Sequence, residues 1–393
     1  MRVFLLFSGP FPQGLAGVQH VVCESLGLSK CLENFKLVLY LRTVNRDADD
    51  GSPEKGTYKG IKYEFINGKI MYSSKMRRRI TSAFALLRTF VWGIRYYHKN
   101  DIVYCFEGLN SRLFLFMLSA KIKGAKFVRE IVEIPYYNMS LSSRWHRWFE
   151  GAFFFPHYDG VVSISHPLNE YASQHVSKKA QLHIQPILVQ DEENTQYDKA
   201  PFDFPYIIHT GTMYEQKDGI SYILKAFSEF KKTDCSGCKL VFAGPHSNDK
   251  CSFLPMINEL GIGESVVMLG MINDRERLTN LQHFAAMSIV YRFDNLQTRY
   301  GFSTKIGEFL MSGAPLITTN VGEQEYYLKD RENAFVVEPY DIHQLAITMG
   351  YIMNNPEESR AVGLRGRKLA QDVFNPIHQG ERLMEFFKKL LEK

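Results

Sequence analysis

The sequence predicts an α/β fold of two doubly wound parallel-sheet domains, each with helices on both faces of its sheet. The chain has 393 residues, more than one hydrophobic core usually holds. Apolar segments of strand length alternate with helical segments through both halves. These runs are continuous rather than alternating, which is typical of strands buried on both faces. A polar, acidic and proline-flanked segment at 185–205 separates the halves.

The first half begins with strand Val3–Phe7, and 47–60 is a charged, glycine-rich loop or hairpin. The further strands that we expect are Lys36–Leu41, Ile102–Phe106, Phe127–Ile131 and Gly160–Ile164, and the helices are Gly17–Cys31, Ser111–Lys121 and Ser143–Phe155.

The second half repeats the alternation, and its last helix, Ile377–Leu391, has no strand after it and must pack on elements already formed. We place an N-terminal domain at 1–190, a linker at 191–204, a C-terminal domain at 205–374 and a final helix at 375–393 that can cross back to the first domain. The expected strands are Tyr206–His209, Lys239–Ala243, Val266–Met268, Met287–Val290 and Leu316–Thr319, with helices Ile220–Lys231, Leu254–Leu260, Arg275–Gln282 and one around Glu308.

Composition favours a protein of the cytoplasm, with contact at the inner face of the membrane as an option. The hydrophobic fraction is 45% and the charged fraction 23%, both ordinary for a globular protein. No apolar run approaches the roughly 20 residues that span a bilayer. The apolar start, Met1–Phe7, is too short for a signal-peptide core and is predicted to be a strand.

Two basic segments are candidates for membrane contact. Lys75–Arg79 opens a predicted helix over 75–95 whose apolar residues are interspersed with Arg88 and Arg95. Such a helix can dock on anionic headgroups, or it can face the core with a solvated end. The cluster Arg144–Phe149 can lie at a membrane interface or pack between domains.

The cysteine pattern favours reduced thiols and no metal site. The chain is not rich in cysteine and shows no secretory signal. Cys235 and Cys238, with His246 and Cys251 after them, have the ligand types of a zinc site. Their spacing is irregular, however, and the pair lies in a polar turn before a strand.

Three loops carry candidate binding residues. The loop at 301–304 enters a helix whose first N–H groups can bind an anion, and Glu308, one turn later, can accept hydrogen bonds from hydroxyls; a solvated glutamate is the alternative. Gly14 and Gly17 lie between a strand and a helix, in a turn that lacks the GxGxxG dinucleotide pattern. Beside Gly211, Lys217 can pair with phosphate or be a solvated loop residue.

These segments resemble the retaining glycosyltransferases of the GT-B fold, specifically glycosyltransferase family 4. The resemblance runs through nearly the whole chain and is strongest over 206–339. Family features are matched by Gly211 with Lys217-Asp218-Gly219, by Val241-Phe242-Ala243-Gly244, by Val266-Val267-Met268-Leu269-Gly270, and by Glu308 followed by Ser312-Gly313-Ala314-Pro315. The resemblance implies two Rossmann-like domains that face each other across a cleft.

The resemblance also implies roles for these residues. Lys217 would neutralise charge on a leaving diphosphate, Glu308 would hold the nucleotide ribose, and Met271 would lie near the base. Donor binding would also involve Gly14, Gly17, Gly211, Lys305 and the backbone of Phe302, Ser303 and Thr304. The reaction would use a UDP- or GDP-sugar without a metal or other cofactor, and a saccharide or lipid-linked acceptor in cell-surface polysaccharide biosynthesis. No nucleic-acid partner is expected.

The sequence departs from the family at two positions. Tyr300 stands where the first of two glutamates is expected, and Thr212 stands where a basic residue is usual; Lys305 or Arg299 can supply the missing charge. The donor-contacting histidine of the N-terminal domain is not evident, and Glu130 or Glu133 can take its place or be solvated. These departures keep a second hypothesis open, a catalytically silent GT-B scaffold that binds nucleotide or a protein partner.

Overall fold

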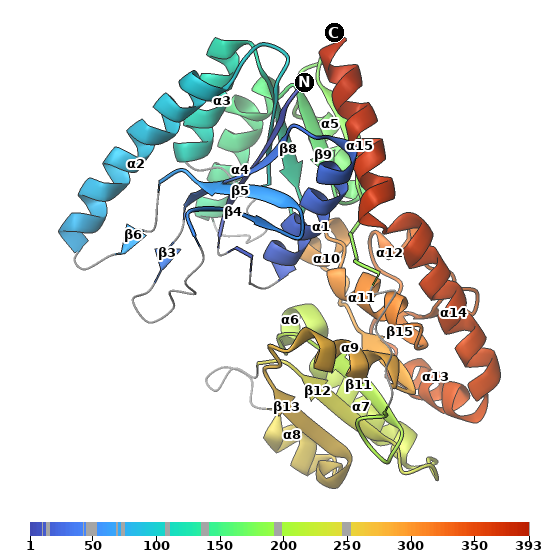
Figure 1. Cartoon of the computed structure of the whole chain (residues 1–393). Coiled ribbons are helices and arrows are strands. Elements are labelled where there is room, and N and C mark those ends of the chain that lie inside the picture. The colour runs from blue at the N-terminus through green and yellow to red at the C-terminus, as the bar shows by residue number, and fades with distance from the viewer. Residues whose placement is uncertain are drawn as a thin grey trace. The chain divides into compact units, whose positions relative to one another are not determined.

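The computed structural model divides the chain into two compact units. It describes residues 1–9, 11–12, 16–41, 43–44, 53–67, 70–71, 75–106, 111–134, 141–191, 199–245 and 253–392. The first unit comprises Met1–Leu188 together with Asn375–Lys393, and the second comprises Val189–Phe374. The final helix therefore belongs to the unit that contains the N-terminus (Figure 1).

The first unit is built on a sheet whose strands run in the order β10-β9-β8-β7-β1-β2-β5-β4. All neighbouring pairs are parallel except β4 and β5, which form an antiparallel hairpin at one edge. The strands are β1 (Val3–Ser8), β2 (Phe35–Leu41), β4 (Lys55–Tyr58), β5 (Ile61–Phe65), β7 (Ile102–Cys105), β8 (Lys126–Ile131), β9 (Gly160–Ser163) and β10 (Gln181–Ile184), and β3 (Thr43–Val44) pairs separately with β6 (Ile70–Met71).

Helices cover both faces of this sheet. Alternate residues of β1 face opposite ways: Leu5 belongs to a core cluster with Phe387, whereas the Phe4 ring meets the Trp92 ring edge-on at 5.8 Å. One face thus carries α1 (Ala16–Cys31) and α15 (Pro376–Leu391), and the other carries α2 (Lys75–Tyr96), α3 (Ser111–Lys123) and α4 (Leu141–Phe153), while η2 (Phe155–His157) and α5 (His166–Ser173) complete the unit.

Two glycines allow α1 and α15 to pack closely. A Cβ added at Gly27 would lie 2.0 Å from the carbonyl oxygen of Pro376, and one at Gly380 would lie 2.6 Å from the carbonyl carbon of Gly27. The apolar side chains Leu383 and Phe386 of α15 then join the core of the first unit. The C-terminal helix is therefore an integral part of that core.

The second unit has an all-parallel sheet in the order β13-β12-β11-β14-β15-β16. Its strands are β11 (Tyr206–Thr210), β12 (Lys239–Ala243), β13 (Val266–Gly270), β14 (Met287–Val290), β15 (Leu316–Thr319) and β16 (Phe335–Val337). Its helices are α6 (Glu215–Asp218), α7 (Ile220–Lys231), α8 (Leu254–Glu259), η3 (Gly263–Ser265), α9 (Arg275–His283), α10 (Leu296–Tyr300), α11 (Thr304–Ser312), α12 (Gln324–Tyr327), α13 (Ile342–Asn354) and α14 (Pro356–Val373).

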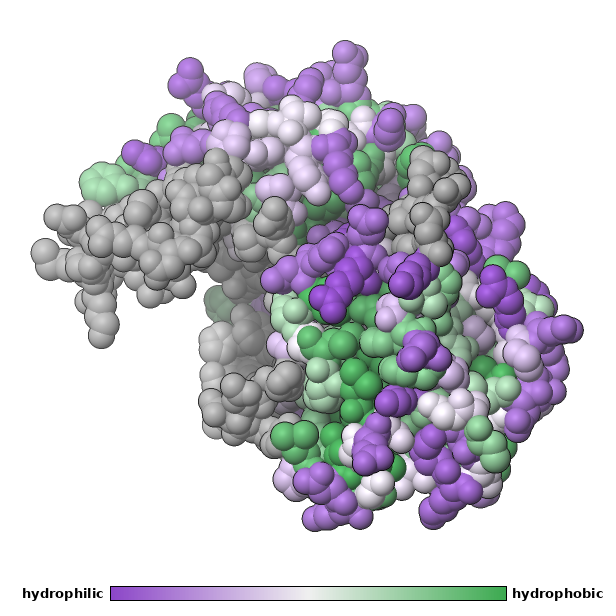
Figure 2. Space-filling view, turned by 60° about the horizontal axis from the view of Figure 1, so that its bottom comes forward, coloured by the Kyte–Doolittle hydropathy of each residue, from purple (hydrophilic) through white to green (hydrophobic). Residues whose placement is uncertain are grey.

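The core of the second unit lies between the central strands and helices α7 and α13. Ile207, Leu240 and Ile289 contribute from the strands, and Phe227 and Leu345 from the helices, all essentially inaccessible to solvent. On the face drawn in Figure 2, hydrophobic residues gather in one area that hydrophilic residues border. The edge strand β13 is partly exposed along its whole length.

The architecture confirms the predicted fold class of two α/β units with parallel sheets, apart from the antiparallel edge strand β4. Strands β10 and β16 and helices α10, α13 and α14 add to the predicted elements. Among the described residues, no helix combines the length and the apolar character that crossing a membrane requires.

Candidate functional site

The second sheet reverses its direction of winding between β11 and β14. From β11 the chain moves outward through β12 to β13, and β14, β15 and β16 follow on the opposite side. Loops at such a switch point lead away from each other, and doubly wound sheets bind ligands there, beyond the carboxyl ends of the strands. Gly211 and Lys217 follow β11, so two of the predicted residues lie at this switch point.

Two glycines keep space open beyond these strands. Gly211 has φ +100°, a conformation that favours glycine, and a Cβ added there would lie 2.6 Å from Cε of Lys305. A Cβ at Gly244, after β12, would lie 2.0 Å from the carbonyl oxygen of Gly211. The absence of side chains at both positions lets Lys305 of α11 reach across the end of β11.

Lys305 ends in a cluster of buried charges. Its ammonium Nζ lies 2.7 Å from Oδ1 of Asp218, a carboxylate that is 1% exposed. The guanidinium Nη1 of Arg292, which follows β14, lies 3.8 Å from the same oxygen. Two cations therefore share one buried carboxylate, and the cluster carries excess positive charge at a site that suits an anionic ligand.

The charges shift each other's pKa values. The pKa of Lys305 is lowered to about 8, chiefly by burial and also by the charges of Arg292 and Lys217, whereas Asp218 opposes the change. Burial would raise the pKa of Asp218, but Lys305 and Arg292 together hold that pKa below its usual value. At neutral pH, Lys305 is thus protonated and Asp218 ionised.

His209 is a buried neighbour of these charged residues. Its side chain is fully buried on β11, and Nδ1 lies 3.1 Å from the carbonyl oxygen of Ile289. A carbonyl only accepts, so Nδ1 carries the hydrogen. Burial and the charge of Lys305 lower the pKa of His209 to about 3. The imidazole is therefore neutral and adds no charge to the site.

The helix that carries Lys305 also places Glu308. Ser303 is the N-cap residue of α11, and its side chain does not cap the first N–H groups. Phe302 is buried and stacks on Tyr327 with ring centroids 5.5 Å apart, which anchors the loop that enters the helix. Residues three apart share a helix face, so Glu308, partly buried, lies one turn beyond Lys305 on the same face.

Lys217 lies on the short helix α6 and is partly exposed. Its carbonyl oxygen accepts a 3.4 Å hydrogen bond from Arg292. The positive charge of Lys217 helps to lower the pKa of Lys305. Gly219 ends α6 with φ +54°, and a Cβ there would lie 2.3 Å from the Tyr291 ring. The predicted residues Gly211, Lys217 and Lys305 are thus brought together.

The structure also places four other residues that the sequence singled out. Met271 is half exposed and follows β13, at the edge of the sheet. Thr212 is exposed, and Tyr300 ends α10. Arg299 pairs with Asp294, with Nη2 2.8 Å from Oδ2. Of the two predicted sources of extra positive charge, Lys305 is the one that faces Gly211.

In the first unit, Gly14 lies outside the described residues, whereas Gly17 is exposed in the first turn of α1. A Cβ added at Gly17 would meet only the Phe106 ring, 3.9 Å away. The surface beside this turn is therefore open.

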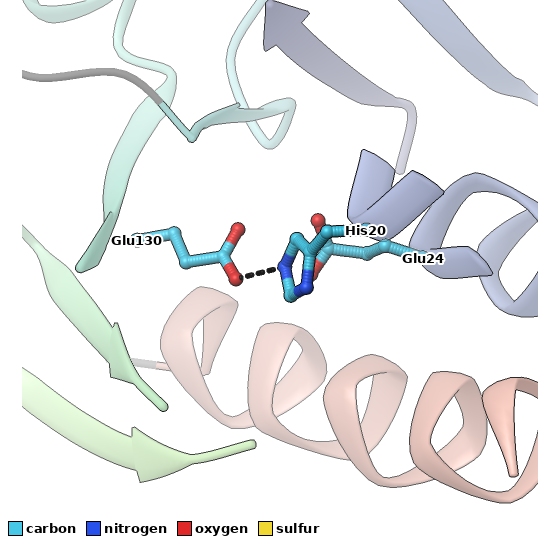
Figure 3. A group of neighbouring side chains, drawn as sticks. All are labelled: His20, Glu24 and Glu130. Carbon is cyan, nitrogen blue, oxygen red and sulfur yellow. Dashed lines mark hydrogen bonds and ion pairs between the residues drawn. The ribbon is translucent and has the colours of Figure 1, made fainter. Parts of the chain in front are cut away.

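Sequence reasoning missed a polar cluster beneath α1. Nε2 of His20 lies 2.6 Å from Oε1 of Glu130 on β8, and Glu24 lies one helical turn beyond His20 (Figure 3). Oε1 of Glu24 accepts hydrogen bonds from the Tyr104 hydroxyl at 2.5 Å and from Nε2 of Gln185 at 2.6 Å. Glu130 is 1% exposed, so it is not a solvated residue. His20 and Glu24 are four residues apart, which places both side chains on one face of a helix. This spacing was the sequence signal that could have indicated the cluster.

This cluster has the ligand types of a metal centre. One ligand atom from each of His20, Glu24 and Glu130 lies within 4.8 Å of the others. Among the described residues, the second oxygens of both glutamates have no hydrogen-bond partner. Burial, followed by the charge of Glu130, raises the pKa of Glu24 well above its usual value. Both effects favour the neutral form of Glu24.

The structure describes two of the four residues in the candidate zinc group. Cys235 is exposed and Cys238 is buried, and burial raises the pKa of the Cys238 thiol to about 12. Their predicted co-ligands His246 and Cys251 lie outside the described residues. Glu133 is exposed beyond the end of β8.

Comparison with known proteins links the second unit to sugar transfer. Residues 204–355 match the family model of the glycosyl transferases group 1. The chain is 30% identical over 121 residues to the MMP alpha-(1->4)-mannosyltransferase of Mycolicibacterium hassiacum, a region that spans 30% of this chain and 28% of that enzyme. The match thus covers less than a third of either protein.

Solved structures resemble the whole chain. Sucrose-phosphate synthase from Thermosynechococcus elongatus superimposes with a TM-score of 0.73 at 16% identity over all of both chains. A glycosyltransferase from Rickettsia africae gives 0.70 at 16% identity, covering 100% of this chain and 99% of that one. HepE from Anabaena, in complex with UDP-glucose, gives 0.70 at 12% identity, covering 99% and 100%. At these identities the likeness shows the fold alone, and that fold is the GT-B architecture of two Rossmann-like domains.

Proposed function

We propose that this protein is a retaining glycosyltransferase that moves a sugar from a nucleotide-diphosphate sugar to a saccharide or lipid-linked acceptor. One observation carries the proposal: the segment that matches glycosyl transferases group 1, residues 204–355, contains the whole positively charged cluster around Lys305. A buried group with more cations than anions is suited to a ligand that gains negative charge during the reaction.

The chemistry follows from the charge that develops on the leaving group. When the bond between sugar and phosphate breaks, negative charge builds on the diphosphate, and fixed positive charges and N–H dipoles stabilise it. Lys217, Lys305 and the backbone of Phe302–Thr304 would supply these groups. Retention would proceed by front-face substitution, which needs no nucleophile from the enzyme. With these charges present, the reaction needs no metal for this step.

Other residues would hold the rest of the donor. Glu308, on the same helix face as Lys305, would accept hydrogen bonds from the ribose hydroxyls, and Met271 would lie near the base. Gly211 would admit the diphosphate, and Gly14 and Gly17 would lie against phosphate or sugar. HepE was solved with UDP-glucose, so UDP-sugars come first among candidate donors, followed by GDP-sugars.

The acceptor and setting are inferred from chemistry that relatives share. The mannosyltransferase relative transfers to a saccharide by its name, so we propose a saccharide or lipid-linked saccharide acceptor in cell-surface polysaccharide biosynthesis. A cytoplasmic protein at the inner face of the membrane fits such an acceptor, with contact through the 75–95 segment.

The test is the release of UDP or GDP from a panel of sugar nucleotides, combined with thermal unfolding in the same ligands. A ligand that binds the native state raises its apparent stability. We expect one sugar nucleotide to stabilise the protein and to be consumed when acceptor is present. Binding without turnover across donors and acceptors would instead support the silent scaffold, which Tyr300 and Thr212 favour. Absence of both binding and turnover contradicts both hypotheses.

A further inference from the structure

Three helices of the first unit expose a continuous series of large apolar side chains. On α2, α3 and α4, these residues recur every three or four positions, so each series forms a stripe along one side of its helix. Phe84 is 61% exposed and Trp145 is 62% exposed. The full set, which we call the helical face, is Phe84, Leu87, Val91, Phe114, Leu118, Ile122, Trp145, Trp148, Phe149 and Phe153.

On α2 and α3, the helical face is additional to an apolar stripe that the helix already buries. Trp92 of α2 and Phe116 of α3 face the sheet, with ring centroids 6.4 Å apart in an edge-on contact. A helix at the surface of a water-soluble domain needs one apolar stripe, turned towards the core. A second stripe indicates a second apolar environment.

The three stripes belong to one surface. Helices α2 and α3 pack side by side (Figure 1). Phe114 of α3 contacts Phe154, just beyond α4, edge-on at 6.0 Å, and Phe154 in turn contacts Phe149 at 5.8 Å. Exposed apolar patches of this extent mark interaction sites.

Exposed arginines border the helical face. Arg88, Arg95 and Arg144 are exposed, whereas Lys121 pairs with Asp159, with Nζ 2.7 Å from Oδ2. The one acidic residue in the three helix sequences is Glu150, which is 2% exposed and turned inward. Basic side chains beside apolar stripes match a surface that is negative at its boundary and apolar beneath.

We propose that the helical face docks on the surface of an anionic lipid bilayer. Apolar side chains would enter the boundary between headgroups and acyl chains, Trp145 and Trp148 would lie at headgroup level, and the arginines would pair with lipid phosphates. A second copy of this chain fits less well, because a two-fold contact would set one basic surface against another. The docking does not depend on the reaction of the second unit.

The test is flotation of the full-length protein with vesicles of phosphatidylcholine alone or with 30% phosphatidylglycerol, a composition chosen as the probe. We expect binding to the anionic vesicles and little to the neutral ones. The apolar variant Leu87→Glu/Ile122→Glu/Trp148→Glu should lose binding. The charge variant Arg88→Glu/Arg95→Glu/Arg144→Glu should weaken it at least about 100-fold, because each basic residue contributes about a factor of five.

Matched controls come from the second unit. Leu254→Glu/Ile347→Glu/Leu364→Glu replaces equally exposed apolar residues, and Lys225→Glu/Arg277→Glu/Arg360→Glu makes the same charge change at exposed positions; both should bind as the wild type does. Thermal unfolding of every variant checks the fold.

Three outcomes would overturn the proposal. In the first, the wild type fails to float with anionic vesicles. In the second, the control variants lose binding as much as the helical-face variants do. In the third, sedimentation shows a stable dimer that only the apolar variant dissociates. Nucleotide binding, measured on the same proteins, keeps a failure of docking distinct from a failure of the proposed sugar transfer.

Discussion

Nζ of Lys305 donates to Oδ1 of Asp218 over 2.7 Å and joins two segments that are 87 positions apart in the chain. One segment follows β11 and the other starts α11, so the bond links the two sides of the point where the sheet reverses its winding. The same oxygen lies near Arg292. The position and charge of this lysine therefore depend on strands from both halves of the sheet.

The affinity for a nucleoside diphosphate should depend on pH through Lys305. Because its pKa is lowered to about 8, the ammonium loses its proton as the pH rises through that value, and a diphosphate loses a partner. Above pH 8 we expect the Kd of UDP to rise by up to about tenfold per pH unit, as loss of one proton allows. Calorimetry between pH 7.5 and 9.5 measures this. Lys305→Arg should flatten the profile, and a flat wild-type profile would contradict the assignment.

Removing the carboxylate of Glu308 should weaken nucleotide binding. A hydrogen bond to a charged acceptor contributes about 1.5–3 kcal/mol, so Glu308→Ala should raise the Kd of UDP by roughly 10- to 150-fold. The 2′-deoxynucleotide distinguishes a ribose contact, because it should bind the wild type more weakly but bind the variant about as well as UDP does. Glu264→Ala, at an exposed position in the same unit, is the control. Unchanged affinity in Glu308→Ala removes the ribose role.

Lys217→Ala should lower turnover far more than it lowers stability. The side chain is partly exposed, so its loss leaves no cavity, but the leaving diphosphate would lose a positive charge. We expect kcat to fall about 100-fold or more, with a change in the free energy of unfolding within about 0.5 kcal/mol. Steady-state kinetics and urea unfolding measure the two effects. If turnover survives, the role passes to Lys305.

Gly211→Ala should disturb both the turn and Lys305. The added Cβ would meet Cε of Lys305 at 2.6 Å, in a backbone conformation with φ +100° that disfavours alanine. We expect a loss of about 1–3 kcal/mol in stability and weaker UDP binding. Gly261→Ala is the control, since Gly261 has φ +64° with open space around it; it should lose stability through strain alone and bind UDP normally. Equal UDP affinity in both variants would show that Lys305 does not depend on Gly211.

Glu24→Gln should change how stability depends on pH. The pKa of Glu24 is raised above 4.5 in the folded protein, so between the unfolded and folded pKa values the folded state holds more protons. Stability from this group is then lost as the pH rises through that window. The glutamine variant, which stays neutral, should show a smaller loss in chemical unfolding at successive pH values. A slope identical to that of the wild type would mean that Glu24 is ionised in the folded state.

The sequence was sufficient to predict the strands and helices that a short run of neighbouring residues identifies. Continuous apolar runs identified strands such as Lys239–Ala243 and Met287–Val290 with the bounds that the structure has. Strand β10, Gln181–Ile184, was not predicted, because its residues are partly polar and are partly exposed at the edge of the sheet. Edge strands bury less surface, so their pattern is weaker.

The site was predictable in part. Lys217 and Lys305 stood beside glycines, which the sequence shows, but Asp218 and Arg292 gain their roles from burial and from neighbours distant in sequence. The cluster of His20 and Glu130 likewise joins residues 110 positions apart. Which charges face each other depends on strand order, and strand order is set by packing of the whole sheet.

The place of helix α15 in the core of the first unit has a consequence for biosynthesis. During translation, all residues of the second unit, Val189–Phe374, are synthesised before α15 is. The first unit lacks Leu383, Phe386 and Phe387 from its core until then. Domains usually fold in the order of their synthesis, but here the unit whose synthesis begins first receives its last core residues only after the whole second unit has been synthesised.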